Sequence, residues 1–206
     1  INKDFVITAK AGYKLSLTDT ANGEWVDSLT ASDETGNGKL TFFVKNTETG
    51  VISAAVTENY KIDKTAPTGE VKLNERTAFQ KFINTITFGL FFKDTQTVTI
   101  TATDNSGDAV KIEYLLSAKA LTEAELADAA FTVYTAPSFS IDPDNEYIIY
   151  VRLMDTAGNT AYICSDGIVL DGTSPVIKGI ENGKTYCEAQ TVTIDEKYID
   201  TVIVNE

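Results

Sequence analysis

Hydrophobic and polar residues alternate over short stretches of this sequence, and turn-forming residues separate one stretch from the next. The clearest case is residues 97–103, where Val98, Ile100 and Ala102 fall on one face and threonines fall on the other. A period of two is typical of a β-strand with one buried face. Residues 104–108, Asp-Asn-Ser-Gly-Asp, are a cluster of turn formers. This pattern predicts a strand that ends in a tight turn.

Similar short strands are expected along most of the chain. The strongest lie in its middle, at residues 86–92, 97–103, 110–114, 147–153, 161–164 and 167–170. Others are expected near the two ends, at residues 4–9, 14–18, 39–45, 58–62, 191–194 and 198–204. Many short strands with turn signals between them predict an all-β chain of the β-sandwich type.

Two stretches with helical spacing interrupt the strands. Thr122 and Glu125 have the spacing of a capping box, which predicts a short helix over residues 122–127. Phe79, Phe82 and Ile83 also have helical spacing, and they predict a second short helix that covers an open end of the sandwich. These phenylalanines could instead form a binding patch. Core packing is favoured, because large apolar side chains are usually buried.

A repeat divides the chain. Four residues recur after 108 positions, and the matched pairs are Gly50 and Gly158, Asp63 and Asp171, Thr65 and Thr173, and Pro67 and Pro175. Proline has no amide hydrogen and holds the residue before it extended, so we expect a strand to end there and a stiff linker to begin. The repeat predicts modules at residues 1–67 and 68–175, and the start of a third at residues 176–206. The first module is small, which leaves open that a leading strand is missing. The first and last residues suggest a fragment of a longer protein.

Composition excludes several classes of partner. The 206 residues include 17 basic and 30 acidic side chains, for a net charge of −13, which disfavours binding to nucleic acid or anionic lipid. The chain has no histidine, so the commonest general base and metal ligand is missing. No stretch reaches the roughly 18 apolar residues of a membrane helix, so no membrane insertion is expected.

The two cysteines, Cys164 and Cys187, lack the CxxC spacing of a zinc site. A disulfide between them is one alternative in a secreted protein. Free, partly buried thiols are favoured, because the two residues fall in different predicted modules.

Carboxylates are the remaining candidates for chemistry. Turns hold Asp104, Asp108, Asp142, Asp144, Glu146 and Asp155. No segment has the spaced aspartates of a local calcium loop, and aspartates in turns normally bond their own backbone. We therefore predict no metal site, no cofactor and no catalytic residue. Two alternatives stay open: calcium at Asp63 and Asp171 that stiffens the joints between modules, and a covalent Lys–Asn crosslink.

Five stretches together carry a resemblance. They are residues 63–67 (Asp-Lys-Thr-Ala-Pro), 86–93, 104–107, 155–159 (Asp-Thr-Ala-Gly-Asn) and 165–175. With them, the chain resembles the bacterial immunoglobulin-like repeats of large surface proteins from clostridia and related gut Firmicutes, most closely over residues 60–204. Residues 179–186 resemble the start of a further repeat. The resemblance implies tandem immunoglobulin-like modules that are exported, held at the Gram-positive cell wall, and have no catalytic residues to carry over.

The expected function is therefore a non-catalytic, extracellular stalk, spacer or adhesive element whose partners are neighbouring domains of the same polypeptide. One alternative is a module that binds a glycan or a host protein through exposed aromatic rings such as Trp25, Tyr134 or Tyr198. For Trp25, a core position is favoured over such a platform. Another alternative is an accessory region of a secreted glycan-degrading enzyme.

Overall fold

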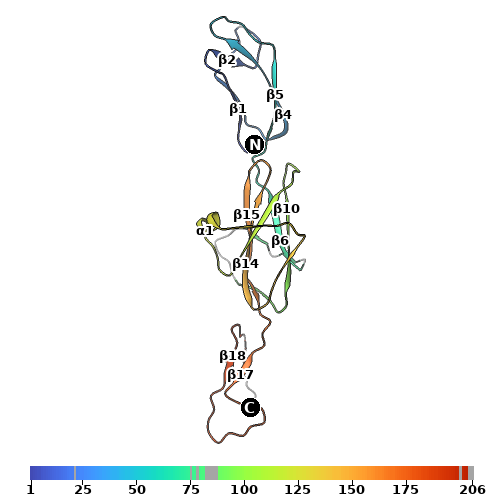
Figure 1. The fold of residues 1–206 in the computed structure, drawn as a ribbon, viewed down its shortest axis with the longest axis vertical. Coiled ribbons are helices and arrows are strands. Elements are labelled where there is room, and N and C mark those ends of the chain that lie inside the picture. Colours follow the sequence, from blue (N-terminus) through green and yellow to red (C-terminus); the bar gives the residue numbers. More distant parts are fainter. Residues whose placement is uncertain (21, 75, 78, 82–87, 200, 204–206) are drawn as a thin grey trace.

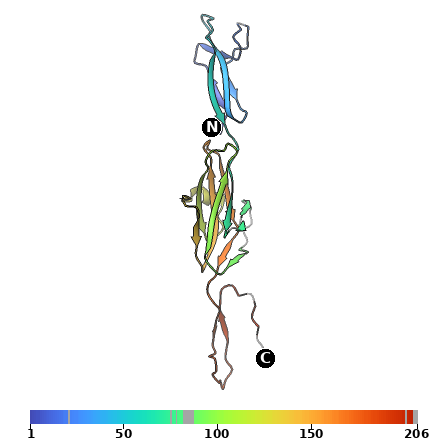
Figure 2. The ribbon, with the colours of Figure 1, turned by 90° about the vertical axis from the view of Figure 1, so that its right-hand side faces the viewer.

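The protein is an elongated row of three segments (Figure 1), and Figure 2 shows the same row from the side. The computed structural model describes residues 1–206 except 21, 75, 78, 82–87, 200 and 204–206, and at 76, 77 and 79–81 it describes the backbone alone. We call residues 1–67, 68–175 and 176–206 the first, second and third segments. In the described part of the chain, strands pair only within a segment. Whether each segment folds by itself stays a prediction.

The first segment contains two small antiparallel sheets. Strand β1 (Phe5–Thr8) pairs with β3 (Ser28–Ala31). The long strand β4 (Thr35–Asn46) lies between β2 (Tyr13–Ser16) and β5 (Val56–Ile62). Four of these five strands were predicted. Strand β3 was missed, because Ser-Leu-Thr-Ala is too short and too polar to stand out in the sequence.

The second segment begins with a four-stranded antiparallel sheet. Its order is β13 (Phe139–Ile141), β10 (Gln96–Thr103), β6 (Thr68–Leu73) and β7 (Arg76–Thr77). Strand β10 is the alternating stretch of the sequence, and Val98 and Ile100 are buried on its inner face, as predicted.

A seven-stranded sheet makes the other layer of the second segment. Its main path is β12 (Thr132–Val133), β11 (Lys111–Ser117), β14 (Asn145–Met154), β15 (Thr160–Ser165) and β8 (Phe79–Lys81). Off this path, β16 (Ile168–Leu170) pairs with β14 and runs parallel to β9 (Leu90–Phe92).

The two sheets of the second segment bury one common core. Val71 and Val98 from the four-stranded sheet cluster with Ile149, Val151 and Leu153 from the seven-stranded sheet, and each is fully buried. Burial of aliphatic side chains of this size contributes about 1.5–3 kcal/mol each. The second segment thus has two sheets packed face to face, and the described chain is mainly β.

The single described helix, α1 (Glu123–Asp128), has the predicted capping box. The Glu125 backbone N–H donates to the Thr122 hydroxyl, and the Thr122 backbone N–H donates to the Glu125 carboxylate. Leu126 is buried against Ile148 and Tyr150, so the helix covers one face of the seven-stranded sheet.

The second predicted helix is wrong where the structure describes it. The backbone of Phe79–Lys81 is strand β8, which pairs with the edge of β15. So few apolar residues fit a strand as well as a helix. The hydrogen bonds offered by the edge of β15 favour the strand. Phe82 and Ile83 lie outside the described residues, as do positions 86 and 87 of the next predicted strand.

The third segment is a single hairpin of β17 (Val176–Lys178) and β18 (Thr193–Asp195). The strand predicted over residues 198–204 is wrong at 198, 199 and 201–203, where the described backbone is irregular. A strand needs a hydrogen-bonded neighbour, and no described strand pairs with these residues.

The two linkers lie before the repeated prolines rather than after them. Strand β5 ends at Ile62, and β6 begins at Thr68, directly after Pro67. In the same way, β16 ends at Leu170 and β17 begins at Val176. The prediction of a linker that starts at each proline was therefore wrong, because the proline instead ends it. We call residues 63–67 the first joint and 171–175 the second joint.

Both cysteines are free thiols, as expected. Cys164 is buried, and burial together with nearby Asp166 raises the pKa of its thiol. Cys187 is exposed, which corrects the expectation that both would be partly buried.

Candidate metal centre at the first joint

Side chains from both neighbouring segments hold the first joint. The Asn159 side-chain amide, from the second segment, donates to the backbone carbonyls of Asp63 at 2.8 Å and Thr65 at 3.2 Å. From the first segment, the Glu34 carboxylate accepts the Lys64 backbone N–H at 2.5 Å and the Thr65 hydroxyl at 3.0 Å. The joint is therefore an ordered part of the structure with partners on either side.

The turn that follows β10 brings Asp104 to this joint. Asp104 Oδ2 accepts the Ser106 backbone N–H at 2.8 Å and the Ser106 hydroxyl at 2.5 Å. Gly107 closes the turn at φ +74°, a conformation that favours glycine. The other carboxylate oxygen, Asp104 Oδ1, is buried and has no hydrogen-bond partner.

The turn that follows β14 presents Asp155 at the same end of the second segment. Its Oδ1 accepts the backbone N–H groups of Gly158 at 2.7 Å and Asn159 at 2.8 Å, and its Oδ2 accepts the Asn159 side chain at 2.7 Å. Burial by itself would raise the pKa of Asp155, but these hydrogen bonds outweigh it and the pKa is lowered. The carboxylate is thus held in its charged form.

Asp63, in the joint, completes a cluster of three carboxylates with Asp104 and Asp155 of the second segment. One ligand oxygen from each of Asp63, Asp104 and Asp155 lies within 4.8 Å of the other two. Asp63 is only 4% exposed. Its Oδ1 accepts the Thr65 backbone N–H at 3.2 Å, whereas its Oδ2 is buried without a partner. A buried acceptor without a partner costs about 1–3 kcal/mol, and more when it is charged.

A hard divalent cation fits this donor set. Calcium binds carboxylate and carbonyl oxygens at about 2.3–2.6 Å, so two of its ligands lie at most about 5 Å apart. The separation of the three aspartate oxygens is within that limit. Calcium takes about six to eight oxygens, so backbone carbonyls or water would complete the shell. Zinc fits poorly, because its structural sites use cysteine and histidine.

A separate ion pair lies beside the cluster. The Lys61 ammonium contacts Asp108 Oδ2 at 2.5 Å, and the Thr156 hydroxyl donates to the same oxygen at 2.9 Å. This contact raises the pKa of Lys61 and lowers that of Asp108. The pair joins the first segment to the second, and the charges of Asp63 and Asp104 also help to raise the pKa of Lys61.

The three aspartates were each considered from the sequence, but their meeting was not predicted. Asp104 and Asp155 bond their own turns, as expected, and Asp63 likewise accepts the Thr65 backbone N–H. The buried oxygens of Asp63 and Asp104 that lack a partner were not predicted. A usable signal was present, because Asp104 and Asp155 each begin an Asp-x-x-Gly turn. The three carboxylates make the first joint a candidate cation site, where the sequence predicted none.

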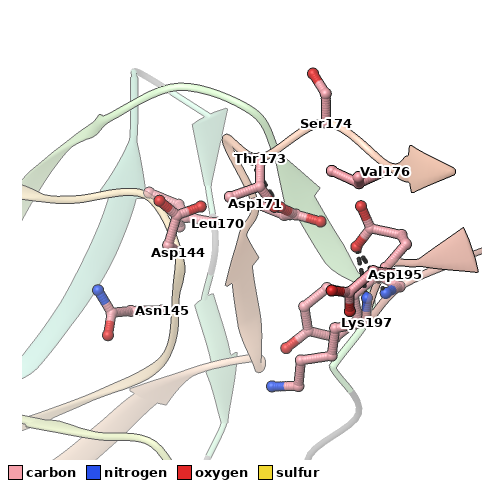
Figure 3. A pocket seen from close by; sticks show the side chains of 11 residues that line it. Asp144, Asn145, Leu170, Asp171, Thr173, Ser174, Val176, Asp195 and Lys197 are labelled. Atoms are coloured by element: carbon pink, nitrogen blue, oxygen red, sulfur yellow. Dashed lines mark hydrogen bonds between the residues drawn. The ribbon is translucent and has the colours of Figure 1, made fainter. Parts of the chain in front are cut away.

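The second joint differs from the first. Asp171 Oδ1 accepts the backbone N–H and the hydroxyl of Thr173, at 3.1 and 2.8 Å. Asp144 Oδ1 accepts the Gly172 backbone N–H at 3.0 Å. These carboxylates line a cavity of about 340 Å³, shown in Figure 3. Within the described residues, the one group of three close carboxylates is that of the first joint.

The aromatic residues considered as a sugar platform do not form a row. Trp25, Tyr134 and Tyr198 are each half-buried and lie in three different segments. The Tyr134 hydroxyl accepts the Ile100 backbone N–H, and the Trp25 ring lies under Lys45, with 5.3 Å from the ammonium to the ring centroid. Their contacts with neighbouring side chains and backbone indicate packing roles.

The covalent crosslink has no support in the described residues. Where lysine ammonium groups have hydrogen-bond partners there, those partners are carboxylates, a tyrosine side chain or a backbone carbonyl, and none is an asparagine side chain.

The sequence matches no protein-family model, and a search of curated proteins finds no significant relative. Among the helices of the described residues, none is long and apolar enough to cross a bilayer.

Proposed function

We propose that this chain is a non-catalytic part of a bacterial surface protein, built from immunoglobulin-like β-sandwich modules, and that it acts as a stalk or spacer. We further propose that a bound calcium ion stiffens its first joint. Three lines of support are the end-to-end row of segments, the two-layered sheet of the second segment, and the resemblance to bacterial surface repeats.

One observation carries the calcium proposal. Asp63 Oδ2 and Asp104 Oδ1 are buried, have no hydrogen-bond partner, and belong to carboxylates that bring the linker and the second segment together. Buried polar groups in folded proteins nearly always have partners. A divalent cation would supply the partner that both oxygens lack and would offset the repulsion among three negative charges.

The cation would act on the joint through Asp63. This residue lies in the linker, whereas Asp104 and Asp155 lie in turns fixed to the sheets of the second segment. A cation bound to all three would tie the linker to the second segment and limit bending between the two modules. A row of modules with stiff joints gains length and holds a distal domain away from the cell.

The outside of the cell suits such a site. Extracellular calcium modules have dissociation constants on the order of 0.1–1 mM, which calcium in the surroundings can satisfy. An extracellular location therefore follows from the same proposal. Binding of a glycan or host protein, and service as an accessory region of an enzyme, gain no specific support from the described residues.

Calorimetric titration of the full chain with calcium tests the proposal. We expect binding with a dissociation constant of about 1 mM or below. The substitutions Asp63→Asn and Asp104→Asn keep the side-chain shape and remove a ligand charge, so each should weaken binding by at least about tenfold, which corresponds to 1.4 kcal/mol.

The matched control is Asp171→Asn, at the repeat position equivalent to Asp63. It removes the same charge from the same kind of turn, so calcium binding should persist. The proposal fails if the chain takes up no calcium at millimolar concentration, or if all three variants weaken binding equally.

A further inference from the structure

A second sequence repeat identifies which element faces each joint. Gln-Thr-Val-Thr-Ile occurs at residues 96–100 and again at residues 190–194. The first copy lies in β10, and the turn after β10 brings Asp104 to the first joint. The second copy runs into β18, and the turn after β18 carries Lys197 and Tyr198 to the second joint. The same position in each module thus meets the module before it.

Lys197 and Tyr198 contact the end of the second segment directly. The Tyr198 hydroxyl donates to the Glu146 carboxylate, and the Lys197 ammonium contacts the same carboxylate oxygen at 2.6 Å. The Tyr198 ring meets Phe91 edge-on, with 5.8 Å between ring centroids. Glu146 lies in β14 and Phe91 in β9, two strands joined through β16. Hydrogen bonds from Lys197 and Tyr198 lower the pKa of Glu146.

The other carboxylates beside these residues have local partners. Asp195 pairs with Lys178 at 2.5 Å, and Glu196 accepts the backbone N–H groups of Lys197 at 2.7 Å and Tyr198 at 3.1 Å. Figure 3 shows Asp144, Asp171, Asp195 and Lys197 around the cavity of this joint. No buried carboxylate oxygen without a partner occurs among the described residues of this joint.

We infer that the second joint is held by direct contact between segments, through a latch of Lys197 and Tyr198 on Glu146 and Phe91, and that this latch needs no cation. The residues after the recurring Gln-Thr-Val-Thr-Ile strand determine which mechanism a joint uses. An aspartate there completes a cation site with the linker aspartate, whereas a Lys-Tyr pair docks on the preceding module. Removal of calcium then loosens the first joint and leaves the second in place.

Single-molecule energy transfer across the second joint tests this inference on the full chain. The native Cys187 is exposed and carries one label, and Ala136→Cys, at an exposed position of the second segment, carries the other. Cys164 is buried and its thiol pKa is raised, so it should remain unlabelled. We expect a narrow distance distribution that is the same in calcium and in EGTA.

Two substitutions remove the latch without disturbing a core. Tyr198→Phe deletes the hydroxyl, and Glu146→Gln deletes the charge, so each should cause loss of the narrow distribution. Tyr186→Phe is the matched control, because the Tyr186 hydroxyl accepts the Glu181 backbone N–H within the third segment. The double variant Glu146→Lys, Lys197→Glu restores an ion pair in reverse and should recover part of the narrow distribution.

Two results would overturn the inference: a distribution that broadens in EGTA, or one that Tyr198→Phe and Glu146→Gln leave unchanged. Both concern the second joint alone. Failure of the proposed calcium site would instead appear as a lack of calcium uptake, and would leave these measurements untouched.

Discussion

The side-chain amide of Asn159 donates a hydrogen bond of 2.8 Å to the backbone carbonyl of Asp63, across 96 residues of sequence. The same amide donates to Asp155 Oδ2 at 2.7 Å. Asn159 thereby connects the linker to one of the three clustered carboxylates. Its position explains how the protein itself can order the first joint, whether or not a cation binds there.

Substitution of Asn159 should loosen the first joint. Asn159→Ala removes the bonds to Asp63 and Thr65, each of which contributes about 0.5–1.5 kcal/mol. The linker contains Lys64, so trypsin cleavage there should become faster. Asn145→Ala, which removes a bond to the Pro143 carbonyl within another turn, should leave this rate unchanged. Equal cleavage rates in both variants would contradict the role of Asn159.

Calcium should raise the melting temperature of the chain. A ligand that binds only the folded state stabilises it by RT ln(1 + [L]/Kd), or about 2.7 kcal/mol at 100 times Kd. Differential scanning calorimetry in calcium and in EGTA measures this shift. Asp104→Asn should abolish most of it, whereas Asp171→Asn should keep it. A melting temperature that does not depend on calcium would count against the site.

The capping box of α1 should lose its contribution in acid. Hydrogen bonds from the Thr122 backbone, the Lys119 ammonium and the Thr122 hydroxyl lower the pKa of Glu125 to about 2. The folded-state pKa is depressed, so the stabilisation is present above the ordinary value of 4.5 and is lost as pH falls toward 2. Urea unfolding of Glu125→Ala and of the parent chain should differ at pH 7 and converge near pH 2. Glu123→Ala should show no such convergence.

Removal of the Thr122 side chain also tests how much the capping box of α1 stabilises the protein. Thr122→Ala should destabilise the second segment by about 0.5–2 kcal/mol, the usual effect of removing an N-cap. An unchanged urea midpoint would show that tertiary packing of Leu126 alone holds the helix.

Core substitutions test whether the segments fold separately. Leu153 is fully buried in the second segment, and Leu153→Ala should cost about 2–5 kcal/mol there. Hydrogen exchange should then rise in β10 and β14 while β4 and β5 keep their protection. The reciprocal variant Phe42→Ala, in the first segment, should expose β4 and β5 alone. Loss of protection in both segments from either change would show one cooperative unit.

The sequence predicted those features that depend on neighbouring residues. Alternation in β10 reflects one buried and one exposed face, and the Thr122–Glu125 box closes within a single turn of helix. The residues of strand β8 were expected to form a helix, because three apolar residues fit the helical period and the strand period equally well. The pairing with β15, which is distant in sequence, decides in favour of a strand. The close approach of Asp63, Asp104 and Asp155 could not be predicted from the sequence either, because it depends on how the linker packs against two turns of the second segment.

Single-molecule energy transfer across the first joint measures whether calcium limits its bending. One label goes on Glu48→Cys, exposed in the first segment, and the other on Ala136→Cys, with Cys187→Ser to remove the third reactive thiol. We expect a narrow distance distribution in millimolar calcium that broadens in EGTA, and a broad distribution under both conditions for Asp63→Asn. A distribution of the same width with and without calcium would contradict it.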